Sequence, residues 1–239
     1  MYFLLSGEGP TDMGLCAGNR TVCEGKLHKE GPMAIIVSQI VERQLNFSFM
    51  DTRYYRYVSK RELVQIAKRF KARKKSPILP GKKKPKETGY FYRNARALAL
   101  CAKDKAEKLN DDVIAVLFRD SDGTASADRG LWKNKWDSMI KGFSDGGFNR
   151  GVPMIPKPKS EAWIICSVKN NPYQGCRDLE SRSGNDNSPR SLKRELTCIL
   201  GNLPSREELC EMVNNGTIDS DRIDMPSFLA FKEALLSVL

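Results

Sequence analysis

The sequence predicts an α/β fold in which helices flank a mostly parallel central sheet. Two observations carry this prediction. Strand-like and helix-like segments alternate along the first two thirds of the chain, and Val113–Phe118 is an unbroken apolar run typical of a strand covered on both faces. The chain has 239 residues, 40% of them hydrophobic, so it can bury a continuous core in one large domain or in one domain with a small appendage.

The first half of the chain is expected to provide two strands and three helices. Tyr2–Leu5 is a short apolar run typical of a buried strand. After a glycine-rich loop, apolar residues recur at helical spacing from Pro32 onward, and a proline suits a first helical turn. Asp51–Val58 is rich in tyrosine and threonine, which favours a strand. Helices are then expected over Lys60–Lys71 and from near Gly89.

The second half is centred on the strand Val113–Phe118 and continues with a helix. The residues expected on the buried face of that helix are Trp132, Trp136, Met139, Ile140 and Phe143. Gly151–Ile155 is then predicted to form a short strand, and Ser160 to cap a helix over Ala162–Val168. Three later helices are predicted, near Ser191–Leu200, Ser205–Val213 and Ser227–Leu239.

These elements suggest how the chain is organised. We expect a core domain over residues 1–169, a loop or linker rich in Asn, Ser, Gly and Pro over 170–189, and a helical segment over 190–239 that packs on the core.

The net charge of +11 is concentrated in one segment. Between Arg53 and Lys108 there are 19 basic residues and four acidic ones, and such clustering creates a field that attracts phosphates. A nucleic-acid partner is therefore favoured, and the alternative is a solvated helix end followed by a loop. Within this segment we expect a mobile basic loop over 71–89. The residues predicted to contact nucleic acid are Arg69, Arg73, Lys74, Lys75, Lys82, Lys83, Lys84 and Lys86.

The cysteines indicate a cellular compartment. All seven are scattered and their number is odd, which favours free thiols in the reducing cytoplasm. A zinc site at Cys16, Cys23 and His28 is a weaker alternative, because it lacks a fourth ligand and a familiar spacing; otherwise His28 is a polar loop residue. No apolar run approaches the roughly 18 residues of a membrane helix, so no membrane partner is expected.

Acidic residues follow three of the predicted strands. Glu8 and Asp12 follow the first strand, Asp120 and Asp122 the central strand, and Glu161 the short strand. Because the carboxyl ends of parallel strands meet at one edge of a sheet, these carboxylates would repel one another unless a cation lay among them. Each acid has a simpler alternative, as a turn former, in an Asx turn or at a helix dipole. Together they favour a site for a hard divalent metal ion.

Two segments resemble the Toprim domain shared by topoisomerases, bacterial primases and several nucleases. They are Leu4-Leu5-Ser6-Gly7-Glu8-Gly9 and Leu117-Phe118-Arg119-Asp120-Ser121-Asp122-Gly123, with a Glu after the first strand and Asp-x-Asp after a later one. The acids in Glu8-Gly9-Pro10-Thr11-Asp12 are similar to those of the nuclease branch related to the overcoming-lysogenization-defect proteins.

A third segment extends the resemblance. Pro158-Lys159-Ser160-Glu161-Ala162-Trp163 is similar to a segment of stand-alone Toprim-like proteins from bacterial defence loci. The resemblance runs from about Met1 to Lys169 and implies a Toprim (Rossmann-like) domain followed by C-terminal helices.

The charges of these residues, taken together with the resemblance, suggest a role for each of them. Glu8, Asp120 and Asp122 would bind the principal Mg²⁺ or Mn²⁺ ion, and Asp12 and Glu161 would bind a second ion or position water. Lys159 would contact the scissile phosphate. Arg119 would contact another phosphate or, as an equally open alternative, pair with a neighbouring acid.

A metal-dependent nuclease that hydrolyses DNA or RNA is therefore the leading functional hypothesis. The resemblance makes it an effector, or toxin, of anti-phage defence. The chain has no Gly-x-x-x-x-Gly-Lys-Ser/Thr loop, so any ATPase would be a separate subunit. Two alternatives remain open, a non-catalytic Toprim-like module that binds nucleic acid or a partner, and a ribonuclease that matures RNA. A homo-oligomer is also open.

Overall fold

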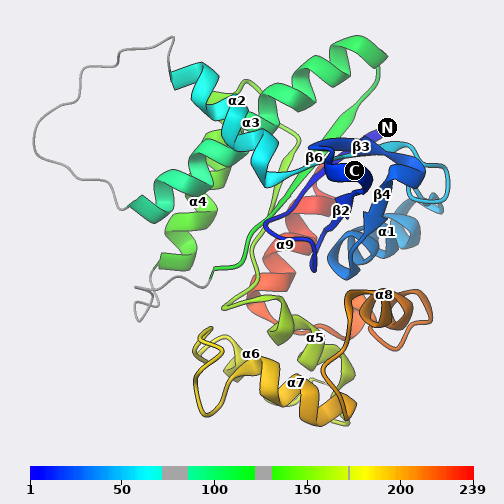
Figure 1. The fold of residues 1–239 in the computed structure, drawn as a ribbon, viewed down its shortest axis with the longest axis vertical. Helices are drawn as coiled ribbons and strands as arrows, with labels where there is room; N and C mark the ends of the chain where they lie inside the picture. Colours follow the sequence, from blue (N-terminus) through cyan, green and yellow to red (C-terminus); the bar gives the residue numbers. More distant parts are fainter. Residues whose placement is uncertain (72–85, 122–130, 172) are drawn as a thin grey trace, which may run out of the picture.

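A computed structural model describes residues 1–71, 86–121, 131–171 and 173–239, and its centre is a five-stranded sheet in the order β3-β5-β1-β6-β7 (Figure 1). These strands are β1 (Tyr2–Ser6), β3 (Val22–Glu24), β5 (Tyr55–Val58), β6 (Val113–Phe118) and β7 (Gly151–Met154). β5, β1, β6 and β7 are parallel, and β3 pairs antiparallel with β5 at the edge. The predicted α/β class with a mostly parallel sheet is confirmed, and the arrangement is compatible with a Rossmann-like fold.

Helices cover both faces of this sheet. α1 (Pro32–Leu45), α5 (Ser160–Val168) and α9 (Pro226–Leu236) contribute to one apolar core, and α2 (Lys60–Lys71), α3 (Lys86–Leu109) and α4 (Leu131–Asp145) contribute to the other. Side chains of a strand alternate between these cores: Phe3 and Leu5 face the first, and Tyr2 and Leu4 the second. Double coverage explains why the central strand is apolar throughout.

The C-terminal helices belong to the first core. α6 (Cys176–Leu179) and α7 (Leu192–Leu200) lie beside α5 at the bottom of Figure 1, and α8 (Arg206–Asn214) lies near α1. α9 runs along β7 and encloses the buried ring of Trp163. The centroids of Phe228 and Phe231 lie 5.0 Å and 6.0 Å from that ring, and its Nε1 donates to Ser227 Oγ at 2.9 Å. This segment therefore completes the covering of the sheet.

Most predicted elements are present, but several details were wrong. The predicted glycine-rich loop contains β3 and a two-stranded antiparallel sheet of β2 (Gly14–Cys16) and β4 (His28–Glu30), whose strands are too short to show a pattern. The fifth strand starts at Tyr55 and not at Asp51, after a turn. Ile140 is 43% exposed, because it lies one residue from Met139 and so about 100° around the helix.

Ser160 is not a helix cap. Lys159 occupies that position, and the helix starts at Ser160 itself. The side chain of Ser160 is used instead for a contact with a distant acid, described below.

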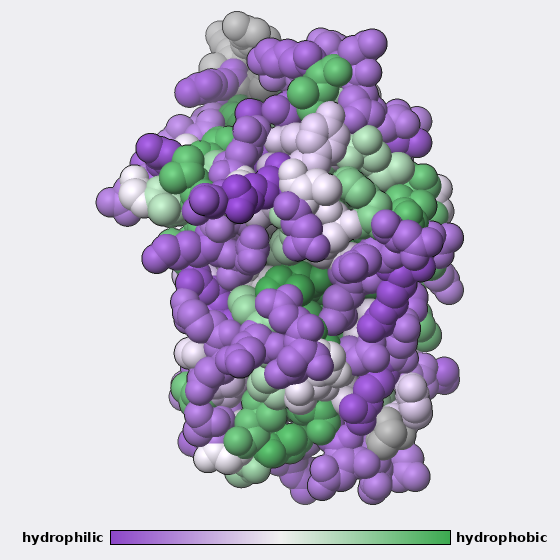
Figure 2. All heavy atoms as spheres, turned by 90° about the vertical axis from the view of Figure 1, so that its right-hand side faces the viewer, coloured by the Kyte–Doolittle hydropathy of each residue, from purple (hydrophilic) through white to green (hydrophobic). Residues whose placement is uncertain are grey.

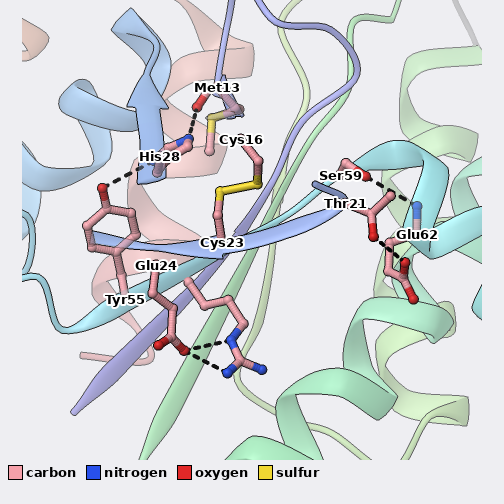
Figure 3. The surroundings of a disulfide bond; sticks show 10 residues. Met13, Cys16, Thr21, Cys23, Glu24, His28, Tyr55, Ser59 and Glu62 are labelled. Atoms are coloured by element: carbon pink, nitrogen blue, oxygen red, sulfur yellow. Dashed lines mark hydrogen bonds and ion pairs between the residues drawn. A yellow bond between two sulfur atoms is a disulfide. The ribbon is translucent and has the colours of Figure 1, made fainter. Parts of the chain in front are cut away.

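The prediction that all the cysteines are free thiols was wrong. Disulfides join Cys16 to Cys23 and Cys166 to Cys176, and Cys101, Cys198 and Cys210 are free. Figure 3 shows the first disulfide between the small sheet and β3. Short separations along the chain, 7 and 10 residues, make both pairs local, but only the folded backbone brings the sulfurs together. The zinc alternative is also wrong, because two of its three ligands are bonded to each other.

Alkylation of the cysteines tests this pairing. Denatured but unreduced protein is expected to take up three N-ethylmaleimide groups, since four of the thiols are tied in disulfides. The same protein reduced beforehand should take up seven. Intact mass spectrometry reads the number directly, and seven adducts without reductant would show that the disulfides are absent from the isolated protein.

His28 is a buried residue of β4 and not a polar loop residue. Its Nε2 donates to the carbonyl oxygen of Met13 at 3.0 Å, and Tyr55 Oη lies 3.2 Å from Nδ1 (Figure 3). The imidazole ring also stacks on Tyr57, with 4.7 Å between the ring centroids. Burial lowers the pKa of His28 to about 4 and outweighs the hydrogen bond to Met13. The imidazole therefore serves as a neutral packing and hydrogen-bonding group.

The depressed pKa of His28 makes stability dependent on pH. Above pH ~7 the ring is neutral in both the folded and the unfolded state, so it contributes no pH dependence there. As the pH falls from ~6.5 to ~4, only the unfolded state takes up a proton, and the free energy of unfolding should drop by about 3 kcal/mol. The chain has one histidine, so NMR can follow a single imidazole. The NMR titration gives the pKa of His28 in the folded protein, and the same titration of urea-unfolded protein gives the reference value. A pKa near 6.5 in the folded protein would contradict the burial of the ring.

The molecular surface is mostly polar on the face shown in Figure 2, where hydrophobic areas are small and separated. Such scattered apolar residues are normal for a globular protein. Within the described ranges, no helix combines the length and the apolar composition needed to cross a membrane.

Candidate functional site at the carboxyl edge of the sheet

The parallel strands bring three loops of the sequence-predicted site to one edge of the sheet. β1 pairs with β6 from Tyr2 to Ser6, and β6 pairs with β7 up to Met154. Their carboxyl ends are therefore adjacent. The loop after β1 carries Glu8 and Asp12, the loop after β6 carries Asp120, and the start of α5 carries Ser160 and Glu161.

Asp12 is positioned by close backbone packing at the start of α1. Its carbonyl oxygen accepts from the backbone N–H of Met33 at 3.0 Å. A Cβ on Gly31 would lie 2.2 Å from the same oxygen, so only glycine allows this approach. A Cβ on Gly7 would likewise lie 2.5 Å from Met13 Cβ, so the loop closes tightly on the residue after Asp12. The carboxylate is thus held by a rigid junction.

Ser160 connects two of the predicted acids. Its hydroxyl donates to Asp12 Oδ1 at 2.6 Å, and its backbone N–H donates to Asp120 Oδ1 at 3.0 Å. Ser121 fastens the same loops, because its N–H donates to Pro156 O and its hydroxyl to Pro158 O, both at 3.1 Å. Residues that follow β1, β6 and β7 are therefore joined in one hydrogen-bonded network.

Two carboxylates at this edge of the sheet, those of Asp12 and Glu161, are electrostatically unfavourable as anions. Burial raises the pKa of Asp12, and the charge of Glu8 adds to this, while hydrogen bonds from Ser160 and Thr11 oppose it. Burial also raises the pKa of Glu161; the charge of Asp12 acts in the same direction, and that of Lys159 opposes it. Each group is therefore stabilised by either a proton or a nearby cation.

Two of the predicted residues are already paired with partners that sequence reasoning missed. Glu8 Oε1 lies 3.0 Å from Lys60 Nζ, at the start of α2. Lys159 is 7% exposed, and its Nζ lies 2.6 Å from Asp186 Oδ1, a residue of the predicted linker. Burial lowers the pKa of Lys60, but the hydrogen bond and the charge of Glu8 raise it above its usual value overall. Nothing in the local sequence signals either contact, because each joins segments far apart in the chain.

Arg119 is fully buried, which the sequence did not suggest. Its Nη1 donates to the carbonyl oxygen of Phe118 at 2.6 Å, and its Cζ lies 5.7 Å from the centroid of the Tyr90 ring. Nε and Nη2 have no hydrogen-bond partner among the described residues. The predicted alternative of a salt bridge with a neighbouring acid is not formed within that part of the chain.

Only two of the remaining predicted residues lie within the described ranges. Arg69 is exposed on α2, and Lys86 is the first residue of α3. The residues that lie outside the described ranges are Arg73, Lys74, Lys75, Lys82, Lys83, Lys84 and Asp122, together with most of the predicted basic loop. In the part of the chain that the structure describes, no group of three or more His, Cys, Asp or Glu side chains is arranged to hold a metal ion.

The comparisons with known proteins add no relative to this picture. No family model matches the chain, and neither a curated protein nor a solved structure is significantly similar to it. What the fold and the site define is therefore a class, an α/β protein with a mostly parallel sheet, compatible with a Rossmann-like fold, that has acidic and basic side chains at the carboxyl edge of this sheet.

Proposed function

We propose that this protein is a metal-dependent nuclease that hydrolyses phosphodiester bonds in DNA or RNA. The observation that carries the proposal is the junction at Ser160, which holds Asp12 and Asp120 from two different strand ends at one point. Burial and the charge of Glu8 raise the pKa of Asp12, as expected where a cation is the missing partner. The resemblance of the two acidic segments to Toprim nucleases supports the same assignment.

The donor chemistry fits Mg²⁺ or Mn²⁺. Hard divalent cations bind carboxylate oxygens, and Asp12, Asp120, Glu8 and Glu161 offer them from three loops. Asp120 with Glu8 and Asp122 would hold one ion, and Asp12 with Glu161 would hold a second ion or orient water. When bound, such an ion supplies Lewis-acid chemistry, which activates water and stabilises the charge that develops on the phosphate.

The chain's own residues would bind and orient the nucleic acid. Lys159, held by Asp186, would be positioned to contact the scissile phosphate. Arg69 and the basic residues between α2 and α3 would contact the phosphate backbone without reading the base sequence. The resemblance to proteins of bacterial defence loci suggests an anti-phage effector that works with a separate ATPase.

A metal-dependence assay tests the proposal. The purified protein is incubated with plasmid DNA, total RNA and tRNA in Mg²⁺, Mn²⁺ or EDTA, and cleavage is expected with a divalent ion and absent with EDTA. Cleavage of plasmid DNA, or general degradation of total RNA, supports the effector hypothesis. Cleavage at defined positions in structured RNA alone indicates a role in RNA maturation. Failure to cleave any substrate at any metal concentration would overturn the nuclease assignment.

A second candidate function is a non-catalytic module that binds nucleic acid or a partner protein. The observation in its favour is that Glu8 is paired with Lys60 and Lys159 with Asp186, so two proposed catalytic groups already have partners. Binding to nucleic acid without cleavage in the assay above would favour this candidate.

A further inference from the structure

Three buried polar atoms beside the candidate site lack hydrogen-bond partners among the described residues. They are Nε and Nη2 of Arg119 and the hydroxyl oxygen of Tyr90; the Lys60 ammonium faces this oxygen but can only donate, so the hydroxyl proton still has no acceptor. A buried donor without an acceptor is costly, and a buried charge without a counter-ion costs more. Native proteins keep few such groups, and each one calls for a partner. Because all three can donate a proton, the group that would satisfy them is an acceptor, and the guanidinium favours an anion.

Two cations lie beside the ring of Tyr90. Arg119 Cζ lies 5.7 Å and Lys60 Nζ 5.5 Å from the centroid of the Tyr90 ring, so two cations approach one aromatic ring. Among the described ion pairs, Glu8 pairs with Lys60, and none involves Arg119. The buried guanidinium of Arg119 therefore forms no salt bridge within the described part of the chain.

The same group of residues adjoins the acidic network. Arg119 directly precedes Asp120, whose carboxylate meets Ser160, and Lys60 contacts Glu8. An anion held by Arg119 and Tyr90 would thus lie next to the carboxylates assigned to the metal. Fork-shaped guanidinium donors and a hydroxyl suit a tetrahedral oxyanion, which offers several acceptor oxygens.

We propose that Arg119 and Tyr90, together with Lys60 beside the Tyr90 ring, form an anion subsite that binds a phosphate group of the nucleic acid. This inference rests on the proposed function for the source of the phosphate. The binding itself needs neither a metal ion nor cleavage, so it is measured separately. The phosphate belongs either to a strand end or to an internal diester, and both present the same oxyanion chemistry.

The test is the effect of inorganic phosphate on thermal stability in EDTA, with chloride at equal ionic strength as the reference. Phosphate is expected to raise the melting temperature of the wild-type protein, because it binds the folded state only. Tyr90→Phe removes one hydroxyl and should weaken phosphate binding about tenfold. In chloride the same variant should be at least as stable as the wild type, since it loses a buried donor that has no acceptor.

Tyr92→Phe is the matched control. Tyr92 lies on the same helix, but its hydroxyl donates to Asp145 at 2.8 Å on the exposed side. Its removal should leave the phosphate response unchanged. Arg119→Lys, if it folds, should lose the response entirely. A wild-type protein that responds equally to phosphate and chloride, or a Tyr90→Phe variant that keeps the full affinity, would overturn the subsite.

Oligonucleotides distinguish the sources of the phosphate. Short strands with a 5′-phosphate or a 5′-hydroxyl are added in EDTA at saturating inorganic phosphate. If only the 5′-phosphorylated strand displaces the bound inorganic phosphate, the subsite binds the phosphate of a strand end. If both strands displace it equally, the subsite binds an internal phosphodiester. No displacement by either would overturn the assignment to nucleic acid. Displacement without metal-dependent cleavage supports the subsite while contradicting the proposed nuclease activity.

Discussion

Asp120→Asn is expected to abolish metal-dependent cleavage, lowering the rate by about a hundredfold or more, because a ligand charge worth several kcal/mol of transition-state stabilisation is lost. The asparagine keeps an oxygen that can accept from the N–H of Ser160, so the junction between the loops should survive. Cleavage of plasmid or RNA under saturating Mn²⁺ gives the rate, and circular dichroism and thermal melting report folding.

Asp112→Asn is the control for this substitution. Asp112 directly precedes β6, so it lies at the opposite end of this strand from Asp120. Its side chain is 64% exposed and forms an ion pair with Arg150. Its loss should leave cleavage unchanged. Glu8→Gln should behave like Asp120→Asn, whereas Asp12→Asn and Glu161→Gln should give smaller or metal-specific losses. A folded Asp120→Asn protein that cleaves at the wild-type rate would show that the metal site is wrongly placed.

Trp163→Ala is expected to lower the free energy of unfolding by about 3–5 kcal/mol, the range typical of large aromatic residues removed from a core. The indole is fully buried and lies against Phe228 and Phe231 of α9, and its N–H bonds to Ser227. The substitution therefore leaves a cavity and an unpaired hydroxyl between α5 and the C-terminal helix. Urea unfolding followed by far-ultraviolet circular dichroism measures the loss.

Leu229→Ala provides the comparison on the same helix. Leu229 is 38% exposed, so its truncation should cost less than about 1 kcal/mol. Two unfolding transitions in the wild-type protein, with Trp163→Ala affecting only one, would indicate that the C-terminal segment folds apart from the sheet. A single transition that shifts as a whole is the expected outcome.

Local patterns in the sequence were sufficient for most of the sheet and its helices. Val113–Phe118 forms β6 as predicted, because a strand covered on both faces needs apolar side chains on both. The helix Lys60–Lys71 also has its predicted bounds. These elements follow from the periodicity of neighbouring residues, which acts within a few turns or a single strand.

Strand direction also predicted that two of the acids, Asp12 and Asp120, lie near each other. Because parallel strands share a carboxyl edge, Asp12 and Asp120 come close together, and the structure places Ser160 between them. What the sequence could not indicate was the role of Ser160, which looked like a helix cap. Its hydroxyl instead meets Asp12, a residue that local analysis cannot relate to it.

Other features depend on contacts between distant segments. The pairing of Lys159 with Asp186 and of Glu8 with Lys60, the burial of Arg119 and the depressed pKa of His28 all arise where separate elements pack together. The disulfides, although local in sequence, likewise require backbone geometry that spacing alone does not define. The sequence by itself determined the fold class and the edge of the sheet where the charged residues gather, because both follow from short-range periodicity and strand direction. Only the tertiary structure decided which of those charges are buried, paired or left without a partner, because desolvation and pairing depend on side chains brought together from throughout the chain.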